Sequence, residues 1–524
     1  MVGLNREQVA ALHWDASKPP MALLGKLVTE RIQATMQGRA EIRNAPDNVS
    51  LAEQEIRLQR VEERLDQARL MGDAVVAAFF SADKPKARET ARAEIEMAAM
   101  GAAEKMWTRL KSLRDGLRQG PHPVTPFHWH LEFPEVFLRD NGGFDAIIGN
   151  PPFLGGIMLS GTIGQHYLHW LSNSFANAGN RADLVSYFFR RAFELARESG
   201  ALGFIATNTL AQGDTRSASL KYICSNGGII YRANRRYKWP GEASVIVSVA
   251  HICKTDSPLT AFLDEKSVEN INSYLVVGKE LDPVPLNANF GRSSKGVDLL
   301  SMGFTFDDNP KGNASPLSKM EEISKCFPDE SSRILPFIGG EEVNESPTHQ
   351  HRRYAINLSD LTEDEAERDY PNLLSVVKEM VKPERESLRD NADGKRLKAN
   401  WWKFNRSRPS LLCELERRDK VIVTSEISAQ FVFAVMQSKM LFSHKLVVFL
   451  VSGLSSLAAL QSRIHNVWVV QFGSTRGVAD DLTYNPGDVF VTFPFPPDFE
   501  SHTDLEAAGP AYPDHRAARM VARG

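Results

Sequence analysis

The chain has 524 residues, of which 42% are hydrophobic and 24% are charged, and its formal net charge at pH 7 is −3. This length is enough for two or three globular domains. No apolar run is long enough to cross a membrane, and the amino terminus lacks the basic-then-apolar pattern of a signal peptide. Because the net charge is slightly negative, a nucleic-acid binder with this composition has to concentrate its positive charge locally.

The four cysteines are Cys224, Cys253, Cys326 and Cys413, and they are widely scattered. No two of them have the spacing of a zinc-binding pair or of a disulfide framework. The cysteines therefore predict neither a metal site nor cross-links, and they are compatible with the reducing cytoplasm.

Residues 21–118 have the pattern of a helical region. Leu51, Leu58 and Leu65 recur one heptad apart, which gives one helix an apolar seam. The repeat does not persist over many heptads, so we expect a helical hairpin that packs on its own domain rather than a long coiled coil. Pro85 is expected to end the helix that precedes it.

A proline-rich and aromatic stretch, GPHPVTPFHWHLEFPEVF, follows at 120–137. Its His128, His130, Glu132 and Glu135 resemble metal ligands by residue type. Their spacing matches no common ligand pattern, and a catalytic zinc needs a third converging ligand. We therefore expect these side chains to serve packing.

Residues 143–255 alternate between strand and helix patterns, which favours a parallel, doubly wound α/β sheet. The predicted strands are FDAIIG, ALGFIATN, GGIIYRAN and ASVIVSVAHI. The predicted helices are GQHYLHWLSNSFANA and ADLVSYFFRRAFELARESG, the second capped by Gly200. In such sheets ligands bind at the carboxyl ends of the strands, and Asn150 to Phe153 lie at one of these ends.

The tetrapeptide Asn150-Pro151-Pro152-Phe153 suits methyl transfer to an exocyclic amine. That nitrogen is a poor nucleophile because its lone pair is delocalised into the ring. The Asn150 side-chain oxygen and the Pro151 carbonyl can accept hydrogen bonds from both of its N–H groups, and consecutive prolines hold the acceptors rigidly. Phe153 offers a face on which a flipped base stacks.

The alternative is a plain proline-rich turn, because asparagine and proline are common in turns. The strand FDAII before the tetrapeptide and the two glycines after it favour the functional interpretation.

The segment GGFDAIIGNPPFLGG resembles the catalytic motif of adenine-N6 DNA methyltransferases. Its flanks FHWHLEFPEVF, RADLVSYFFRRAFELARESGALGFIATNTLAQGDTR, WPGEASVIVSVAHI and YNPGDVFVTFPFP are similar to the MmeI-like group of restriction–modification and phage-defence enzymes, types IIG and IIL. The resemblance covers roughly residues 120–520. It implies an α/β chain with a Rossmann-like methyltransferase domain, a target-recognition domain, S-adenosylmethionine as cofactor and double-stranded DNA as partner.

The resemblance also assigns roles to individual residues. Asn150, Pro151, Pro152 and Phe153 match the catalytic tetrapeptide. The stretch ATNTLAQGDTR at 206–216 continues the wall of the active site, and weaker candidates for that wall are Asp183, Asn208 and Gln212.

The expected organisation has five parts. They are a helical region at 1–120, the catalytic part of the methyltransferase domain at 121–260, a connecting region at 261–345, a mixed α+β target-recognition domain at 346–500 and a polar tail at 501–524.

One expected feature of the family is missing. Residues 1–120 contain no glycine-rich cofactor motif after a strand, and VVQFGSTRG at 469–477 lies too far downstream to supply it. We therefore expect a partial sheet from the carboxyl-terminal part of a larger methyltransferase, with the cofactor half on a separate polypeptide or lost by truncation. Half a sheet exposes an edge strand and an apolar face, which the seam at 51–68 is available to cover.

Two basic clusters are candidate DNA contacts. The stretch 394–408 combines cations that neutralise phosphates with aromatics that stack or wedge, namely Lys395, Arg396, Lys398, Trp401, Trp402, Lys403, Arg406 and Arg408. The alternative is a solvated loop beside a buried tryptophan pair. The second cluster, at 231–241, holds Arg232, Arg235, Arg236 and Lys238 after the third strand.

The sequence thus predicts an adenine-specific DNA methyltransferase in split or truncated form, without a metal and without a nuclease pattern. Cytosine-N4 methylation and methylation of a glutamine amide are alternatives within the class. A catalytically silent DNA-binding or assembly subunit is the alternative from another class, and the missing cofactor motif favours it.

Overall fold

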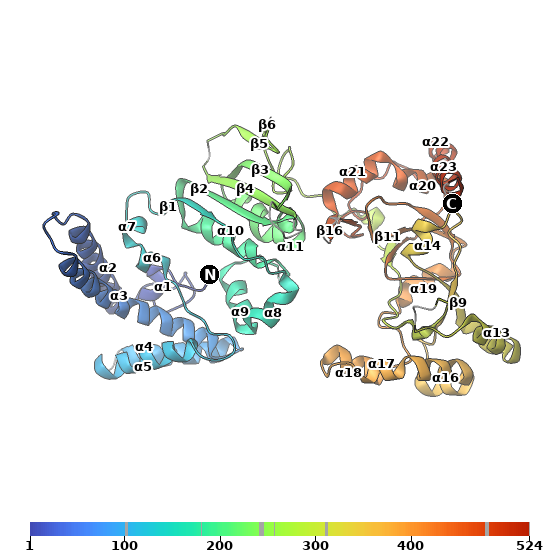
Figure 1. The fold of residues 1–524 in the computed structure, drawn as a ribbon, viewed down its shortest axis with the longest axis horizontal. Helices are drawn as coiled ribbons and strands as arrows, with labels where there is room; N and C mark the ends of the chain where they lie inside the picture. Colours follow the sequence, from blue (N-terminus) through green and yellow to red (C-terminus); the bar gives the residue numbers. More distant parts are fainter. Residues whose placement is uncertain are drawn as a thin grey trace. The chain divides into compact units, whose positions relative to one another are not determined.

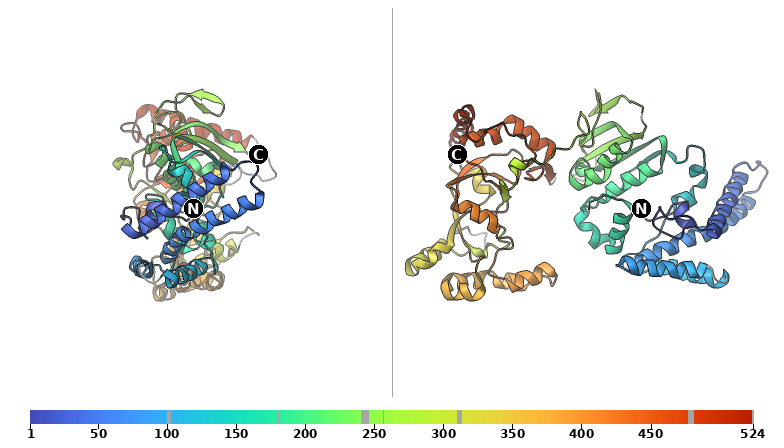
Figure 2. Two further views of the ribbon diagram at one scale, coloured as in Figure 1. Left: turned by 90° about the vertical axis from the view of Figure 1, so that its left-hand side faces the viewer. Right: turned by 180° about the vertical axis from the view of Figure 1, so that it is seen from behind.

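A computed structural model describes residues 1–99, 103–179, 181–239, 246–255, 257–309, 313–476 and 481–522 (Figures 1 and 2). The chain divides into two compact units, Met1–Glu280 and Leu281–Gly524. The region 261–345, expected to connect two domains, is divided between the units. No helix in the described ranges is both long enough and apolar enough to span a membrane.

The first unit begins with a helical region that has its own apolar core. Its helices are α1 (Arg6–Ala10), α2 (Ala22–Arg43), α3 (Leu51–Phe80), α4 (Pro85–Ala99), α5 (Ala103–Leu117), α6 (Trp129–Glu132) and α7 (Pro134–Phe137). Helices α2 and α3 pack against each other as the expected hairpin (Figure 1). Pro85 begins α4 instead of ending the helix before it, because the first turn of a helix tolerates proline.

The apolar seam of α3 is buried only in part. Leu65 is fully buried in the helical core, whereas Leu51 and Leu58 are 72% and 47% exposed. The seam therefore belongs to the helical core at its carboxyl-terminal end, and it does not cover the sheet.

A six-stranded sheet follows, in the order β1-β2-β4-β3-β5-β6. Its strands are β1 (Phe144–Gly149), β2 (Ala196–Thr207), β3 (Gly228–Lys238), β4 (Ile246–Lys254), β5 (Ala261–Leu263) and β6 (Lys266–Val268). The α/β class is confirmed, but the expectation of an all-parallel sheet is wrong. Strands β1 and β2 are parallel, whereas β4 runs antiparallel to both β2 and β3. Residues 239–245 alone separate β3 from β4, and a parallel return needs a crossover of about a dozen residues or more.

Helix α10 covers the sheet through an apolar face. The helices of this part are α8 (Gly156–Ile163), α9 (Gln165–Ser174), α10 (Leu184–Leu195), α11 (Gly213–Arg216) and α12 (Tyr222–Ser225). Val185, Phe189 and Phe193 of α10 belong to the same buried cluster as Leu202 and Phe204 of β2. This packing fixes α10 on the sheet and so positions the segment after β1, which contains α8 and α9, at one end of the sheet.

Helix α10 is shorter than predicted. It ends at Leu195, and β2 starts at Ala196, opposite Phe144 of β1. Gly200 is therefore not a helix cap. A Cβ at this position would lie 2.8 Å from the carbonyl oxygen of Phe144, so glycine allows the two strands to approach at an irregularity of the pairing.

The second unit is mixed α+β, as expected for the carboxyl-terminal part. Its helices are α13 (Leu317–Cys326), α14 (Gly340–Glu345), α15 (Glu363–Asp369), α16 (Pro371–Met380), α17 (Lys382–Glu386), α18 (Ala392–Ala399), α19 (Pro409–Glu416), α20 (Gly453–Gln461), α21 (Arg463–Phe472), α22 (Thr503–Ala508) and α23 (Ala511–Val521). The last two helices lie in the stretch expected to be a polar tail.

The strands of the second unit form two four-stranded sheets and one three-stranded sheet. They are β7 (Ser293–Lys295), β8 (Thr305–Phe306), β9 (Ile334–Ile338), β10 (Arg353–Ile356), β11 (Lys420–Ser425), β12 (Ile427–Ser428), β13 (Ala434–Gln437), β14 (Leu441–Phe442), β15 (Leu446–Phe449), β16 (Ser474–Arg476) and β17 (Asp481–Thr483). Because β7 and β8 belong to these sheets, the second unit takes in much of the expected connecting region.

Candidate functional site

The segment Asn150–Phe153 directly follows β1 at its carboxyl end. Pro151 is buried, Asn150 and Pro152 are exposed, and Phe153 is 37% exposed. Within the described part of the chain the Asn150 side chain makes no hydrogen bond, so its amide is available to a ligand. The structure thus presents an exposed amide before, and a partly exposed aromatic ring after, a rigid Pro-Pro dipeptide.

Asp183 anchors the loop that carries this segment. Its Oδ1 accepts hydrogen bonds from the backbone N–H of Leu154 at 3.2 Å and from that of Val185 at 3.0 Å. The N–H of Leu184 donates to the Leu154 carbonyl at 2.9 Å. Asp183 is 8% exposed, and its own N–H donates to Thr215 Oγ1 at 3.1 Å. The carboxylate therefore caps α10 and fixes the residue after Phe153. The sequence indicated Thr215 only as a member of the stretch 206–216 and gave no separate role to Leu154.

Gly156 provides a second anchor for the same loop. A Cβ at this position would lie 2.2 Å from the Arg181 carbonyl oxygen, so only glycine lets the loop approach the backbone just before Asp183. Of the two glycines after the tetrapeptide, Gly156 thus has a packing role, whereas a Cβ at Gly155 would meet nothing within 4 Å.

Asn208 and Gln212 reach the same edge of the sheet as Asn150. Strand β2 ends at Thr207, Asn208 begins a short 3₁₀ turn, and Gln212 precedes α11. Gly149 of β1 pairs with Phe204 of the parallel strand β2, so the segments that follow the two strands leave the sheet at the same end. Both side chains are half-buried, which is compatible with a place in the wall of a site.

The four cations of the second basic cluster lie within β3 rather than after it, because that strand extends to Lys238. Residues 240 and 241 of this stretch lie outside the described residues. The carboxyl end of β3 lies at the same edge as those of β1 and β2, since both β2 and β3 run antiparallel to β4. Arg232 pairs with Glu265 and Arg235 with Asp264, so these two charges are already compensated.

A groove of about 500 Å³ lies beside β1. Its apolar lining comes from β1, β2, α10 and the amino-terminal region, and includes Phe144, Ile148, Phe188, Ala192, Leu195 and Phe204. Asn150 and Pro151 also line it, so the groove leads directly to the candidate catalytic segment.

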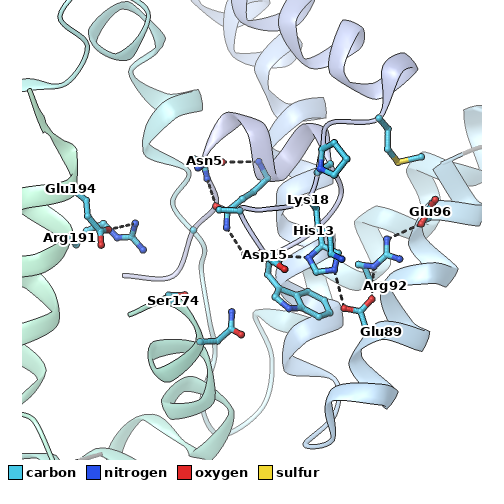
Figure 3. A pocket seen from close by; sticks show the side chains of 18 residues that line it. Asn5, His13, Asp15, Lys18, Glu89, Arg92, Glu96, Ser174, Arg191 and Glu194 are labelled. Carbon is cyan, nitrogen blue, oxygen red and sulfur yellow. Dashed lines mark hydrogen bonds and ion pairs between the residues drawn. The ribbon is translucent and has the colours of Figure 1, made fainter. Parts of the chain in front are cut away.

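A larger, polar cavity of about 920 Å³ is lined by residues of the amino-terminal segment, α4, α9 and α10 (Figure 3). Several of its charged groups are paired: His13 Nε2 lies 3.0 Å from Glu89, and Arg92 lies 2.9 Å from Glu89 and 2.8 Å from Glu96. Burial lowers the pKa of His13, which favours its neutral form. Arg191 of α10 lines both this cavity and the apolar groove.

No strand precedes β1 among the described residues, so no glycine-rich loop follows a strand upstream of Asn150 there. Gly156 leaves no space for a ligand, because it packs on Arg181. In the stretch 469–477, Gly473 follows helix α21 rather than a strand, and Gly477 lies outside the described residues. The site thus has the acceptor side of a methyltransferase without a glycine-rich cofactor loop among the described residues.

The histidines and glutamates near α6 and α7 have structural partners. His128 is 1% exposed, accepts the Leu4 N–H at its Nδ1 and lies 3.3 Å from Asp73. Its three neighbours are similarly engaged: His130 stacks on Phe137, Glu132 pairs with Arg69 and Glu135 pairs with Arg39. In the part of the chain that the structure describes, no group of three or more such side chains is placed to hold a metal ion.

The basic stretch 394–408 in the second unit differs from the expectation for its aromatic residues. Trp401 and Trp402 are 4% and 6% exposed and belong to an apolar core, with their indole N–H groups bonded to Glu363 and the Leu361 carbonyl. They have no face for a base. Phe404 is likewise buried.

Some cations of this stretch have a side-chain partner, and others form no ion pair with a described residue. Arg396 pairs with Asp393 and Lys398 with Asp390, while the Lys403 ammonium lies 5.5 Å from the centre of the Trp402 ring. Arg408 has a left-handed backbone before α19 and is half-buried. Lys395 and Arg406 are exposed and form no side-chain ion pair with a described residue.

Two family models match the chain. Residues 82–231 match the Eco57I restriction–modification methylase, and residues 293–497 match the MmeI target recognition domain. The first match includes Asn150–Phe153, Asp183, Asn208 and Gln212. The chain thus contains a restriction–modification methylase region of the Eco57I/MmeI type followed by an MmeI-type target recognition domain.

Individual relatives agree with this assignment. DNA methyltransferase A of Bacillus subtilis (strain 168) is 24% identical over 438 residues, a match that covers 77% of this chain and 46% of the relative. The solved structure of the type IIL restriction–modification enzyme MmeI in complex with DNA has a TM-score of 0.56 and 19% identity, and the match covers 80% of this chain and 55% of MmeI. The chain therefore shares the fold of MmeI and spans about half the length of these two relatives.

Proposed function

We propose that this chain is the catalytic and DNA-recognition part of an adenine-N6 DNA methyltransferase of a restriction–modification or defence system. One observation carries the proposal: Asn150 has an exposed amide without a partner among the described residues, next to Phe153, at the carboxyl end of β1. The association of this site with a target recognition domain in one chain favours DNA over a glutamine side chain as the substrate.

The residues of the segment have distinct tasks in this reaction. Asn150 Oδ1 and the Pro151 carbonyl accept hydrogen bonds from the two N–H groups of a flipped adenine amine. These bonds draw the amine nitrogen towards tetrahedral geometry and direct its lone pair away from the ring. Phe153 stacks on the base and holds its plane. Asp183 helps to hold Asn150 and Phe153 in position because it fixes the Leu154 amide.

S-adenosylmethionine, when bound, supplies an electrophilic methyl group to the nitrogen that these residues orient. The described residues lack its glycine-rich loop, so we propose that a segment outside the described residues, or a separate polypeptide, provides the cofactor-binding half.

The second unit supplies DNA contacts in this proposal. Lys395 and Arg406 are its best candidates for phosphate contacts, because both side chains are exposed and lack an ion-pair partner among the described residues.

A catalytically silent DNA-binding or assembly subunit is the second candidate function. The absence of a cofactor loop in the described residues favours it. Cytosine-N4 methylation remains an alternative within the first class, because the Asn-Pro-Pro-Phe segment acts on any exocyclic amine.

Base modification in the native host distinguishes these functions. Genomic DNA is sequenced by a method that detects modified bases, from strains with the intact gene, a deleted gene, Asn150→Ala and the control Asn141→Ala. Asn141 is an exposed asparagine at the other end of β1 whose amide donates to the Glu198 carbonyl. We expect N6-methyladenine at one recurrent sequence, lost in the deletion and in Asn150→Ala and kept in Asn141→Ala. N4-methylcytosine in the same pattern would favour the second methyl acceptor, and no gene-dependent modification would favour the silent subunit.

A further inference from the structure

Arg216 is a buried arginine at the end of the stretch that we assign to the wall of the active site. It is the last residue of α11 and is 5% exposed. Its backbone N–H donates to the Gln212 carbonyl at 3.0 Å, and the residue before it, Thr215, accepts the Asp183 N–H at its hydroxyl. A displacement of Arg216 would therefore move the turn that carries Gln212.

The guanidinium of Arg216 binds residues 270–280, which we call the exit segment. Its Nη1 donates to Ser273 Oγ at 2.6 Å and lies 3.5 Å from Glu280 Oε1. Its Cζ lies 3.8 Å from the centre of the Tyr274 ring. Glu280 in turn accepts hydrogen bonds from the Ser273 hydroxyl and, at 2.7 Å, from the Ser273 N–H. One arginine thus holds both ends of the turn from Ser273 to Glu280.

The exit segment is where the chain passes from one compact unit to the other. Glu280 is the last residue of the first unit, and Leu281 begins the second. Ile271 and Leu275 belong to the apolar cluster of the six-stranded sheet, so the segment is folded onto the first unit. The ion pair between Arg216 and Glu280 therefore joins the wall of the site to the last residue before the second unit.

Each partner in this contact has an unusual stretch of backbone. The residues directly after Arg216, Ser217–Lys221, form a π-helical turn, and such turns are rare and occur frequently at functional sites. In the exit segment, Leu275 has a positive φ of 55° although it is 1% exposed. A leucine keeps this left-handed conformation only where the surrounding structure enforces it. Simple packing between a helix and a loop requires neither feature, so both favour a functional role for the contact.

We propose that Arg216 is a positioning residue for methyl transfer, which ties the wall of the active site to the exit segment so that DNA bound by the second unit stabilises this wall. The proposal rests on the proposed function and adds a residue that connects DNA recognition with the reaction. Because the second unit begins directly after Glu280, a displacement of that unit on DNA binding acts first on this carboxylate. The carboxylate then acts on the guanidinium, and the guanidinium acts on α11. The alternative is a contact that only stabilises the first unit.

Two conservative variants of buried arginines separate these roles. Arg216→Lys keeps the positive charge but loses the planar fork that reaches both Ser273 and Glu280. Arg190→Lys is the matched control, because Arg190 is a buried arginine of the same unit, 3% exposed, whose Cζ lies 3.6 Å from the centre of the Tyr222 ring. Both changes remove a cation–π contact of a buried guanidinium, but only the first releases the exit segment.

Hydrogen exchange of the full chain measures the tie itself, without DNA. The N–H groups of Ser273 and Leu275 are bonded to Glu280 Oε2 and to the Asn272 carbonyl. We expect both amides to exchange at least about tenfold faster in Arg216→Lys than in the wild type, because a hydrogen bond to a charged group is lost. In Arg190→Lys they should exchange at the wild-type rate.

Sheared genomic DNA from the strain with the deleted gene provides the second arm, because it contains every target in unmodified form. Adding this DNA should slow exchange of the amide at position 216 by at least about tenfold in the wild type and in Arg190→Lys, but not in Arg216→Lys. The protein is then affinity-purified from the native host and assayed on the same DNA. Arg216→Lys should lower kcat about tenfold to a hundredfold and leave the KM for DNA unchanged, because a misplaced group acts on the chemical step.

Three results would overturn the proposal: exchange in the exit segment that Arg216→Lys does not accelerate, equal acceleration by Arg190→Lys, or a response of position 216 to DNA that persists in Arg216→Lys. The kinetic arm and the host methylation assay separate this failure from that of the proposed function. Wild-type kcat in Arg216→Lys would leave the function intact and make Arg216 a structural anchor only. Absence of any gene-dependent methylation in the host would refute the proposed function, and the positioning role would fall with it.

Discussion

The Oδ1 atom of Asp183 accepts a hydrogen bond from the Leu154 amide at 3.2 Å, immediately after the aromatic residue of the candidate catalytic segment. The same oxygen caps α10 through Val185. One buried carboxylate thus ties the loop after β1 to the helix that covers the sheet, and a change there affects both elements together.

Asp183→Ala should release this loop. It removes the helix cap and the Leu154 anchor, so we expect a loss of about 1–3 kcal/mol in the free energy that protects the amides of Leu154 and Val185 from exchange. Asp183→Asn keeps an oxygen acceptor and should cost clearly less. Hydrogen exchange of the purified chain measures both variants, and equal protection in wild type and Asp183→Ala would contradict the anchoring role.

Asn150→Ala should lower turnover without an equal loss of DNA affinity. The missing acceptor acts mainly in the transition state, and the removal of one such preorganised group costs about a hundredfold to a thousandfold in rate. The measurement is methylation kinetics of the complete assembly on its target DNA, together with DNA binding.

Phe153 should respond differently. Phe153→Ala removes a stacking face worth about 1–3 kcal/mol and should weaken both capture and reaction of the flipped base. Phe153→Tyr keeps the face and should be tolerated. If Phe153→Ala and Phe153→Tyr had the same effect, stacking would not be the role of this ring.

The isolated chain should bind S-adenosylmethionine weakly or not at all. No glycine-rich cofactor loop is present among its described residues, and Gly156 has no room for a ligand because it packs on Arg181. Titration calorimetry measures this directly, and micromolar affinity of the lone chain would show that other residues form the cofactor site.

Lys395→Ala combined with Arg406→Ala should flatten the salt dependence of DNA binding by about one unit of log–log slope for each phosphate that the variant no longer neutralises. Lys398→Ala is the matched control, because its ammonium already pairs with Asp390. Binding is measured at several salt concentrations. A slope that changes for Lys398→Ala and not for the double variant would reverse the assignment.

Acid should destabilise the second unit through His465. Burial lowers the pKa of this residue to about 4, and its Nδ1 and Nε2 contact the Leu460 carbonyl and the Tyr484 hydroxyl. An unfolded histidine has a pKa of about 6.5, so the unfolded state binds more protons between the two values. The free energy of unfolding should therefore be about 2 kcal/mol lower at pH 5 than at pH 7. His465→Gln should flatten this dependence in urea denaturation at both pH values.

Local chemistry decided which features could be predicted from the sequence. The Asn-Pro-Pro-Phe segment and its strand were predictable, because β-strand composition and turn residues act within a few positions of each other. The burial of Trp401 and Trp402 was not, because a basic stretch with aromatics has the same pattern whether the rings face water or a core. The short connection between β3 and β4 made an antiparallel pair predictable, but the place of β4 between β2 and β3 depends on pairing with β2, which lies farther away in the sequence. Likewise, the stretch 206–216 was predicted to line the site, but the role of Thr215 follows only from its hydrogen bond with Asp183.

The apolar edge of β1 has a consequence for the handling of the protein in the cell. Ile148 is 86% exposed, and among the described residues β1 pairs with β2 alone. A strand edge of this kind, with no charge or proline in residues 146–149, readily templates aggregation. Chains on which nothing covers this edge would therefore be removed by the cell's quality control.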